Sequence, residues 1–251
     1  MNLSLSVCCF LKINILQSEL IEYWKGRIIL ASWNELFLDE RNIAALPQPE
    51  VYRFVKKLEG AFTEEKLSIW DLCCGAGRHT VLIAKMGHNA FGSDISENGI
   101  EHTKMWLKNN CLEADLKISD MTEFPWKNQK FHGAFSWDAL HHNTIANIEK
   151  AVQNVYDSLL DGGMFMVSLL STKSGSHHKG REIEYNTFIN DGGDEAGVTH
   201  HYFDESEIRD LFSGWKILNL VEQVSTYIET EPLFYLTNPF PYTKWGVIVQ
   251  K

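Results

Sequence analysis

Short apolar runs alternate with amphipathic segments along most of this chain. Each run has the length of a strand, and the segments between the runs repeat their apolar positions with the period of a helix. Five consecutive strands are expected from this pattern, over residues 68–71, 89–94, 115–119, 131–137 and 164–170. Strands that alternate with helices favour a parallel sheet in an α/β fold.

The last part of the chain departs from this alternation. Two strands are expected over residues 215–225 and 244–251, and no helical pattern lies between them. Strands joined without a crossover helix pair antiparallel. We therefore expect a mostly parallel sheet that ends in an antiparallel hairpin.

The first expected strand leads into a turn of small residues, Asp71-Leu72-Cys73-Cys74-Gly75-Ala76-Gly77, and then into a helix. A turn this tight needs small side chains, because the backbone bends sharply and approaches a ligand closely. The free N–H groups of the helix start would face that ligand. The carboxylate of Asp71 disfavours a pyrophosphate and favours a cationic ammonium or sulfonium group. S-adenosylmethionine carries both cations and no phosphate.

This turn resembles the first motif of class I S-adenosylmethionine-dependent methyltransferases, an acid followed by x-Gly-x-Gly-x-Gly. Asp71 matches the acid, Gly75 and Gly77 match the second and third glycines, and Cys73 replaces the first. The resemblance covers roughly residues 48–251. With the closing hairpin, it implies a Rossmann-like three-layer sandwich whose seven-stranded, mostly parallel sheet has an antiparallel C-terminal hairpin.

Acids also follow the next two strands. Asp94 stands about 20 residues beyond the glycine turn, where an acid holds a ribose hydroxyl pair in dinucleotide folds. The resemblance assigns it the adenosine ribose; alternatively, it is a helix N-terminal charge beside the cap residue Ser96. The resemblance also places Asp120 at the adenine amine and Met121 at the ring face. The expected cofactor-binding residues are Asp71, Cys73, Gly75, Gly77, Asp94, Ile95, Asp120, Met121 and Trp137.

The reaction centre is expected after the fourth strand, at residues 137–142. Ligands of open α/β sheets bind beyond the carboxyl ends of the strands, where the strand order reverses. Methyl transfer is an in-line displacement that depends on positioning and desolvation, and only a protonated nucleophile needs a general base. His141 is our first choice for that base.

Three histidine pairs stand out, at residues 141–142, 177–178 and 200–201. They would converge if the polar insertion of residues 171–203 folded over the reaction centre, and would then offer a base or a metal site. Alternatively, adjacent histidines point apart and bind backbone groups. We predict no metal, because adjacent histidines cannot supply two ligands from one helix face. The acidic residues of the insertion either favour an amine acceptor or form a solvated loop.

Length and composition set the domain organisation. The chain of 251 residues is long enough for one substantial core. We expect an N-terminal extension with lid helices over residues 1–47 and a methyltransferase domain over residues 48–251. The resemblance gives the early helices the task of covering cofactor and substrate; alternatively, their aromatic residues only pack on the sheet.

Charge and cysteine content restrict the partners. A net charge of −10 argues against binding to nucleic acid through its phosphates. Five cysteines without disulfide or zinc spacing suit a reducing cytoplasm. The apolar start of the chain is too short and too polar to span a bilayer, so no membrane partner is expected.

We therefore expect a cytoplasmic S-adenosylmethionine-dependent methyltransferase that acts on a small molecule. One alternative is a non-catalytic S-adenosylmethionine-binding sensor or partner subunit. A dinucleotide-dependent oxidoreductase is disfavoured by Asp71, by the hairpin, and by Thr80 at a position where a glycine would stand. A methyltransferase acting on protein or RNA is the remaining alternative, and the acidic charge balance disfavours RNA.

Overall fold

The computed structural model describes residues 32–39, 42–192, 195–225 and 242–251. The expected N-terminal extension up to residue 31 and the connection over residues 226–241 lie outside the described residues. Everything below concerns the unit from Ala31 to Lys251, within those ranges.

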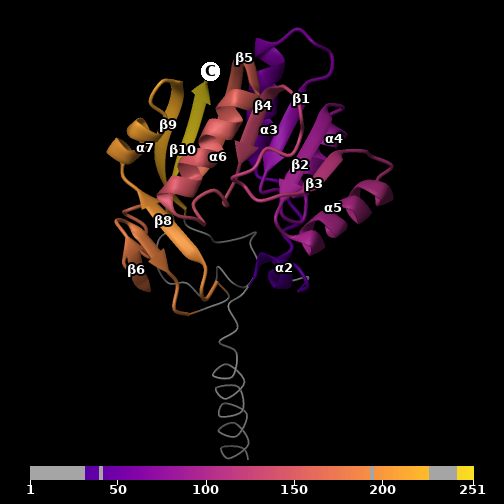
Figure 1. Ribbon diagram of the computed structural model, residues 1–251. Coiled ribbons are helices and arrows are strands. Elements are labelled where there is room, and N and C mark those ends of the chain that lie inside the picture. The colour runs from indigo at the N-terminus through magenta and orange to yellow at the C-terminus, as the bar shows by residue number, and fades with distance from the viewer. Residues whose placement is uncertain (1–31, 40–41, 193–194, 226–241) are drawn as a thin grey trace, which may run out of the picture. The chain divides into compact units, whose positions relative to one another are not determined.

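Seven strands form the main sheet in the expected arrangement (Figure 1). Their spatial order is β3 (Asp115–Ile118), β2 (Asn89–Asp94), β1 (Ser68–Leu72), β4 (Phe131–Ser136), β5 (Leu159–Ser171), β10 (Tyr242–Gln250) and β9 (Lys216–Ser225). The first five are parallel, whereas β10 runs antiparallel to both β5 and β9. The mostly parallel sheet and its antiparallel C-terminal pair are confirmed. The strand order reverses between β1 and β4.

The insertion adds strands that the sequence pattern did not predict. They are β6 (Arg181–Glu184), β7 (Thr187–Ile189) and β8 (Thr199–Phe203). Strand β8 continues the sheet by pairing in parallel with the last residues of β5, Leu170 with Tyr202 and Ser171 with Phe203. Within the described residues the sheet therefore has ten strands, three more than the seven expected.

Helices cover both faces of the sheet, as expected of three layers. The helices of the main domain are α3 (Pro49–Ala61), α4 (Arg78–Lys85), α5 (Glu97–Asn109), α6 (Ile145–Ser158) and α7 (Glu205–Leu211). The apolar side of α3 packs with Ile69 of β1 in one buried cluster. Buried residues of α6 and α7 pack with the next residue, Trp70, in the other. Successive strand residues point to opposite faces, so the two clusters are the two sides of one sheet (Figure 1).

Local sequence signals explain how several elements begin. Asp204 and Glu207 form the capping box that starts α7, as their spacing predicts. Ser96 caps α5 by accepting a hydrogen bond from the backbone N–H of Gly99. Strand β5 begins at Leu159, before the expected start at residue 164, so Gly162 and Gly163 lie inside it, and its pairing with β4 is irregular between Phe131 and Gly133. Among the described residues, no helix has the length and apolar character needed to cross a bilayer.

Candidate active site

The glycine turn connects β1 to α4 at the point where the strand order reverses. Gly75 and Gly77 have φ values of 53° and 90°, in the left-handed region that favours glycine. A Cβ atom on Gly77 would lie 2.4 Å from the Thr103 side chain. Cys73, at the position of the motif's first glycine, also has a positive φ of 61°. The turn thus keeps a glycine conformation although cysteine occupies its first position.

Asp94 at the end of β2 is bonded to this turn. One carboxylate oxygen accepts from the backbone N–H of Gly75 at 2.8 Å, and the other accepts from that of Ser96 at 2.8 Å. Burial raises the pKa of Asp94, and these backbone bonds oppose the rise. A carboxylate offers about four acceptor positions, so roughly two remain for the hydroxyl groups of a ribose.

Asp71 lies deeper than the sequence argument assumed. Its side chain is 1% exposed, and it accepts a hydrogen bond from Thr80 Oγ1 at 2.6 Å. Burial raises the pKa of Asp71 to about 7, against the opposing effect of the Thr80 hydroxyl. Leu72 also follows Asp71 in β1, so the acid is not the last strand residue. Its carboxylate therefore joins the strand to the first turn of α4.

Three of the predicted cofactor-binding residues lie beyond the carboxyl ends of β2 and β3; two of them, Asp120 and Met121, were predicted to contact adenine. Ile95 follows Asp94 directly and is 55% exposed, which leaves an apolar surface for a ring. Asp120 accepts hydrogen bonds from the backbone and the hydroxyl of Thr122. Met121 is partly buried against the main core.

The segment after β4 carries a buried ion pair. Lys244 Nζ of β10 lies 2.8 Å from Asp138 Oδ1, and Ser168 Oγ lies 3.0 Å from the same oxygen. Burial raises the pKa of Asp138, but Lys244 outweighs that effect and the pKa is lowered. The same ammonium lies 4.9 Å from the ring centroid of Trp137. Trp137 Nε1 is buried and has no hydrogen-bond partner among the described residues.

Histidines from two of the three pairs come together beside this segment. The His142 ring lies 4.3 Å from that of His141 and 4.5 Å from that of His200, between ring centroids. Burial first, and then neighbouring histidines, hold the pKa values of His141 and His142 well below the usual range. Both rings are therefore neutral near pH 7. The convergence expected from an insertion folding over this face holds for these pairs.

The pair His177 and His178 has different neighbours. Both rings contact Phe188 in edge-to-face geometry, at centroid distances of 5.5 and 5.4 Å. His177 Nε2 also pairs with Asn186 Oδ1. These contacts belong to the small cluster inside the insertion.

His141 is itself almost inaccessible, with 1% of its surface exposed. Its carbonyl accepts a hydrogen bond from the backbone N–H of His201 at 2.8 Å, which ties the segment after β4 to β8. Its role as a general base stays a prediction.

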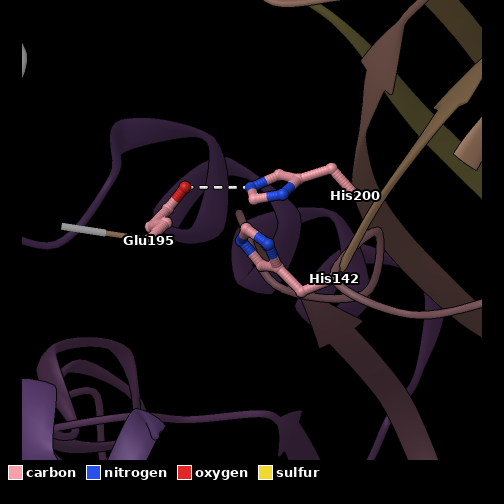
Figure 2. A group of neighbouring side chains, drawn as sticks. All are labelled: His142, Glu195 and His200. Atoms are coloured by element: carbon pink, nitrogen blue, oxygen red, sulfur yellow. Dashed lines mark hydrogen bonds and ion pairs between the residues drawn. The ribbon is translucent and has the colours of Figure 1, made fainter. Parts of the chain in front are cut away.

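Glu195 is a member of this site that sequence reasoning did not single out. Its carboxylate lies 2.9 Å from His200 Nε2, and both side chains face His142 (Figure 2). Burial raises the pKa of Glu195, but its bond to His200 and the nearby His142 outweigh burial and lower it. The sequence showed only an acidic insertion, and spacing alone gave no reason to choose this acid.

The short helix α2 (Trp33–Leu36) lies at the same end of the parallel strands as the insertion (Figure 1). The Trp33 ring centroid is 4.8 Å from that of His142. A Cβ atom on Gly75 would lie 2.9 Å from the Phe37 ring. The segment around α2 thus touches both the glycine turn and the histidine group.

Comparisons with known proteins agree with this geometry. Residues 69–163 match the family model described as a methyltransferase domain. Over 97 residues the chain is 29% identical to an uncharacterized methyltransferase of a Synechocystis species. That match covers 39% of this chain and 44% of the relative, so it spans less than half of the relative's length.

Two solved structures show the same fold. An S-adenosylmethionine-dependent methyltransferase of Methanosarcina mazei superimposes with a TM-score of 0.64 at 17% identity, over 82% of this chain and 98% of that one. The 1,6-didemethyltoxoflavin-N1-methyltransferase of Burkholderia thailandensis superimposes with a TM-score of 0.58 at 15% identity, over 96% and 89% of the two chains. Residues 69–163 thus match the model of a methyltransferase domain, and the fold is similar to that of solved S-adenosylmethionine-dependent methyltransferases.

Proposed function

We propose that this protein transfers a methyl group from S-adenosylmethionine to a small-molecule acceptor and releases S-adenosylhomocysteine. The observation that carries the proposal is the bond from Asp94 to the glycine turn. Asp94 Oδ2 accepts a hydrogen bond from the Gly75 backbone N–H at 2.8 Å. The acid proposed to bind the ribose hydroxyl groups therefore lies directly beside a turn suited to close approach of a ligand. The exposed Ile95 beside it would cover one face of the adenine.

The remaining predicted residues complete the proposed cofactor site. The turn itself contains Cys73 and Gly77, and it follows Asp71, which is bonded to Thr80. The adenine would lie beside Asp120 and Met121. Trp137 would mark the boundary between the methyl donor and the acceptor, since it follows β4 directly. The Burkholderia thailandensis structure contains 1,6-didemethyltoxoflavin and S-adenosylhomocysteine, which supports a small acceptor for this chain as well.

The acceptor side is built by residues 137–142 together with the insertion of residues 171–203, and the segment around α2 is proposed to be its lid. The buried, neutral rings of His141 and His142 would help to exclude water from the nucleophile and the sulfonium, which favours the displacement. We place the protein in the cytoplasm, because Cys73, Cys74 and Cys111 are free thiols, as in a reducing compartment.

Calorimetric titration with S-adenosylmethionine, S-adenosylhomocysteine and NAD tests the proposal. We expect binding of the first two and none of NAD. Asp94→Asn should weaken S-adenosylmethionine binding by about 10-fold, because a charged acceptor of ribose hydroxyls is lost while the amide oxygen still accepts from the turn.

The matched control for this substitution is Asp115→Asn, at the start of β3 and away from the carboxyl edge of the sheet. Its affinity should equal that of the unchanged protein. Equal affinity in Asp94→Asn would remove Asp94 from the ribose site. Binding of NAD alone would contradict the proposed function.

A further inference from the structure

A second group of side chains, beside the proposed cofactor site, has the composition of a metal centre. His142 follows β4, Glu195 precedes β8, and His200 lies within β8. One ligand atom from each lies within 4.8 Å of the others (Figure 2). Each histidine comes from a different pair, so the objection that adjacent histidines cannot both bind one ion does not apply to this group.

His200 is oriented as metal-bound histidines are. Its Nδ1 lies 3.2 Å from the carbonyl oxygen of Val198, and its Nε2 lies 2.9 Å from Glu195 Oε2. A ring that donates Nδ1–H to a carbonyl presents a lone pair at Nε2. A lone pair that faces a carboxylate at this distance needs a cation between the two, either a proton or a metal ion.

His142 provides an independent observation. Its Nδ1 is buried and has no hydrogen-bond partner among the described residues. A buried polar atom without a partner is unfavourable, typically by about 1–3 kcal/mol. The adjacent Trp33 ring offers no hydrogen-bond acceptor to it. Coordination of an ion beside Glu195 and His200 would bring this ring into a polar interaction.

The ligand set selects the kind of ion. Two imidazoles and one carboxylate suit zinc and the neighbouring divalent transition metals, whereas magnesium and calcium prefer oxygen ligands throughout. Three protein ligands leave at least one position open. Zinc bonds of about 2.0–2.2 Å place tetrahedral ligand atoms about 3.3–3.6 Å apart, so the group would close slightly around the ion. Glu195 has 25% of its side chain exposed and is free to make that adjustment.

We propose that His142, Glu195 and His200 bind one divalent transition-metal ion, and that its open position holds the hydroxyl or thiol group of the methyl acceptor. The second part rests on the proposed function. A bound hydroxyl or thiol ionises more readily, so its O–H or S–H bond breaks and the proton passes to solvent. The oxygen or sulfur then forms a bond to the methyl carbon. The methyl–sulfonium bond breaks, and its electron pair stays on sulfur in S-adenosylhomocysteine.

Titration of the chelator-treated full chain with Co²⁺ tests the site, because the visible spectrum of the ion reports its ligands. We expect one Co²⁺ per chain, displaced by Zn²⁺. The variants His142→Ala, His200→Ala and Glu195→Gln should each bind Co²⁺ more weakly by over about 10-fold. The double variant His177→Ala/His178→Ala removes two histidines outside the group and should bind as the unchanged protein does.

Several outcomes would overturn the metal site. These are no binding of Co²⁺, equal affinity in all variants, or an equal loss in the double-histidine control. Because Glu195 is partly exposed, Glu195→Gln should keep the melting temperature of the unchanged protein even if a histidine variant unfolds. The acceptor role has its own readout: a small thiol added to the Co²⁺-loaded chain should produce a sulfur-to-cobalt charge-transfer band. An unchanged spectrum would refute that role.

Calorimetric titration of the same samples with S-adenosylmethionine and S-adenosylhomocysteine separates the two proposals. Binding of S-adenosylmethionine and S-adenosylhomocysteine without Co²⁺ binding would refute only the metal site. Binding of Co²⁺ with neither nucleoside would keep the metal site and refute the proposed function.

Discussion

At the residue scale, Asp71 combines a charge-bearing group with nearly complete burial. Its side chain is 1% exposed and bonded to Thr80 Oγ1 at 2.6 Å. Burial raises the pKa of Asp71 to about 7, so the folded protein holds a proton that the unfolded chain releases near pH 4. Between these two values the unfolded state binds fewer protons. Stability from this group is therefore fully present below about pH 4 and is lost as the pH rises through about 7.

Asp71→Asn should remove this pH dependence. The unchanged protein should lose unfolding free energy relative to the variant as the pH rises from about 4 to 7, by at most about 1.4 kcal/mol per pH unit. The amide oxygen can still accept from Thr80, so the variant should fold. Urea unfolding of both proteins at several pH values measures the difference. Parallel curves for the two proteins would mean that Asp71 does not titrate in this range.

The residue scale also shows what a motif predicts. The motif consists of Asp71, the small turn residues and Asp94, which lie close together in the sequence. The hydrogen bonds that Asp94 accepts from the backbone of Gly75 and Ser96 agree with the arrangement that this motif predicts. The motif did not predict that the Asp71 carboxylate points to Thr80. Side-chain direction depends on the packing of α4 against β1, which spacing does not specify.

At the scale of elements, α2 connects regions that lie far apart in the sequence. Asn34 Oδ1 accepts from the backbone N–H of Asn98 at 2.9 Å, which attaches α2 to the start of α5. Phe37 lies against the glycine turn. No residue of α2 is buried. The helix therefore contributes little to the core, which agrees with its proposed role as a lid over the cofactor.

Phe37→Ala tests this lid. We expect S-adenosylmethionine affinity to fall by about 3- to 10-fold, because part of an aromatic contact surface is removed. The melting temperature should change little. Leu38→Ala is the control, because Leu38 is 70% exposed. Unchanged or tighter binding in Phe37→Ala would show that α2 does not act as a lid over the cofactor.

The elements also show where hydrophobic patterning stops being informative. The central strands β1, β4 and β5 were predictable because they are largely apolar and buried, and every residue of β4 is buried. Strands β7 and β8 carry buried polar residues, and Thr187 Oγ1 pairs with His201 Nδ1 at 2.6 Å. The hydrogen bond between the two side chains satisfies their polar atoms inside the structure. In the sequence, however, segments with such polar residues are typical of a loop. Glu195 and His200 were missed as partners for the same reason.

At the scale of the whole molecule, the last strand is bonded to the segment after β4, where the reaction centre is proposed. Lys244 of β10 reaches across the end of β5 to Asp138, 106 positions earlier in the chain. The two side chains are 8% and 18% exposed. Asp138 also has a positive φ of 56°, an uncommon backbone conformation for a non-glycine residue. The ion pair thus holds the segment that leads to His142 in a fixed conformation.

Removing one member of this pair leaves the other charge buried. Lys244→Met should lower the free energy of unfolding by about 3–5 kcal/mol, and Asp138→Asn should do the same. The double variant should lose less than the sum of the single losses, because each single variant already removes the interaction between the two side chains. Urea unfolding of the four proteins gives the coupling energy. Additive losses would mean that the ion pair does not couple β10 to the segment after β4.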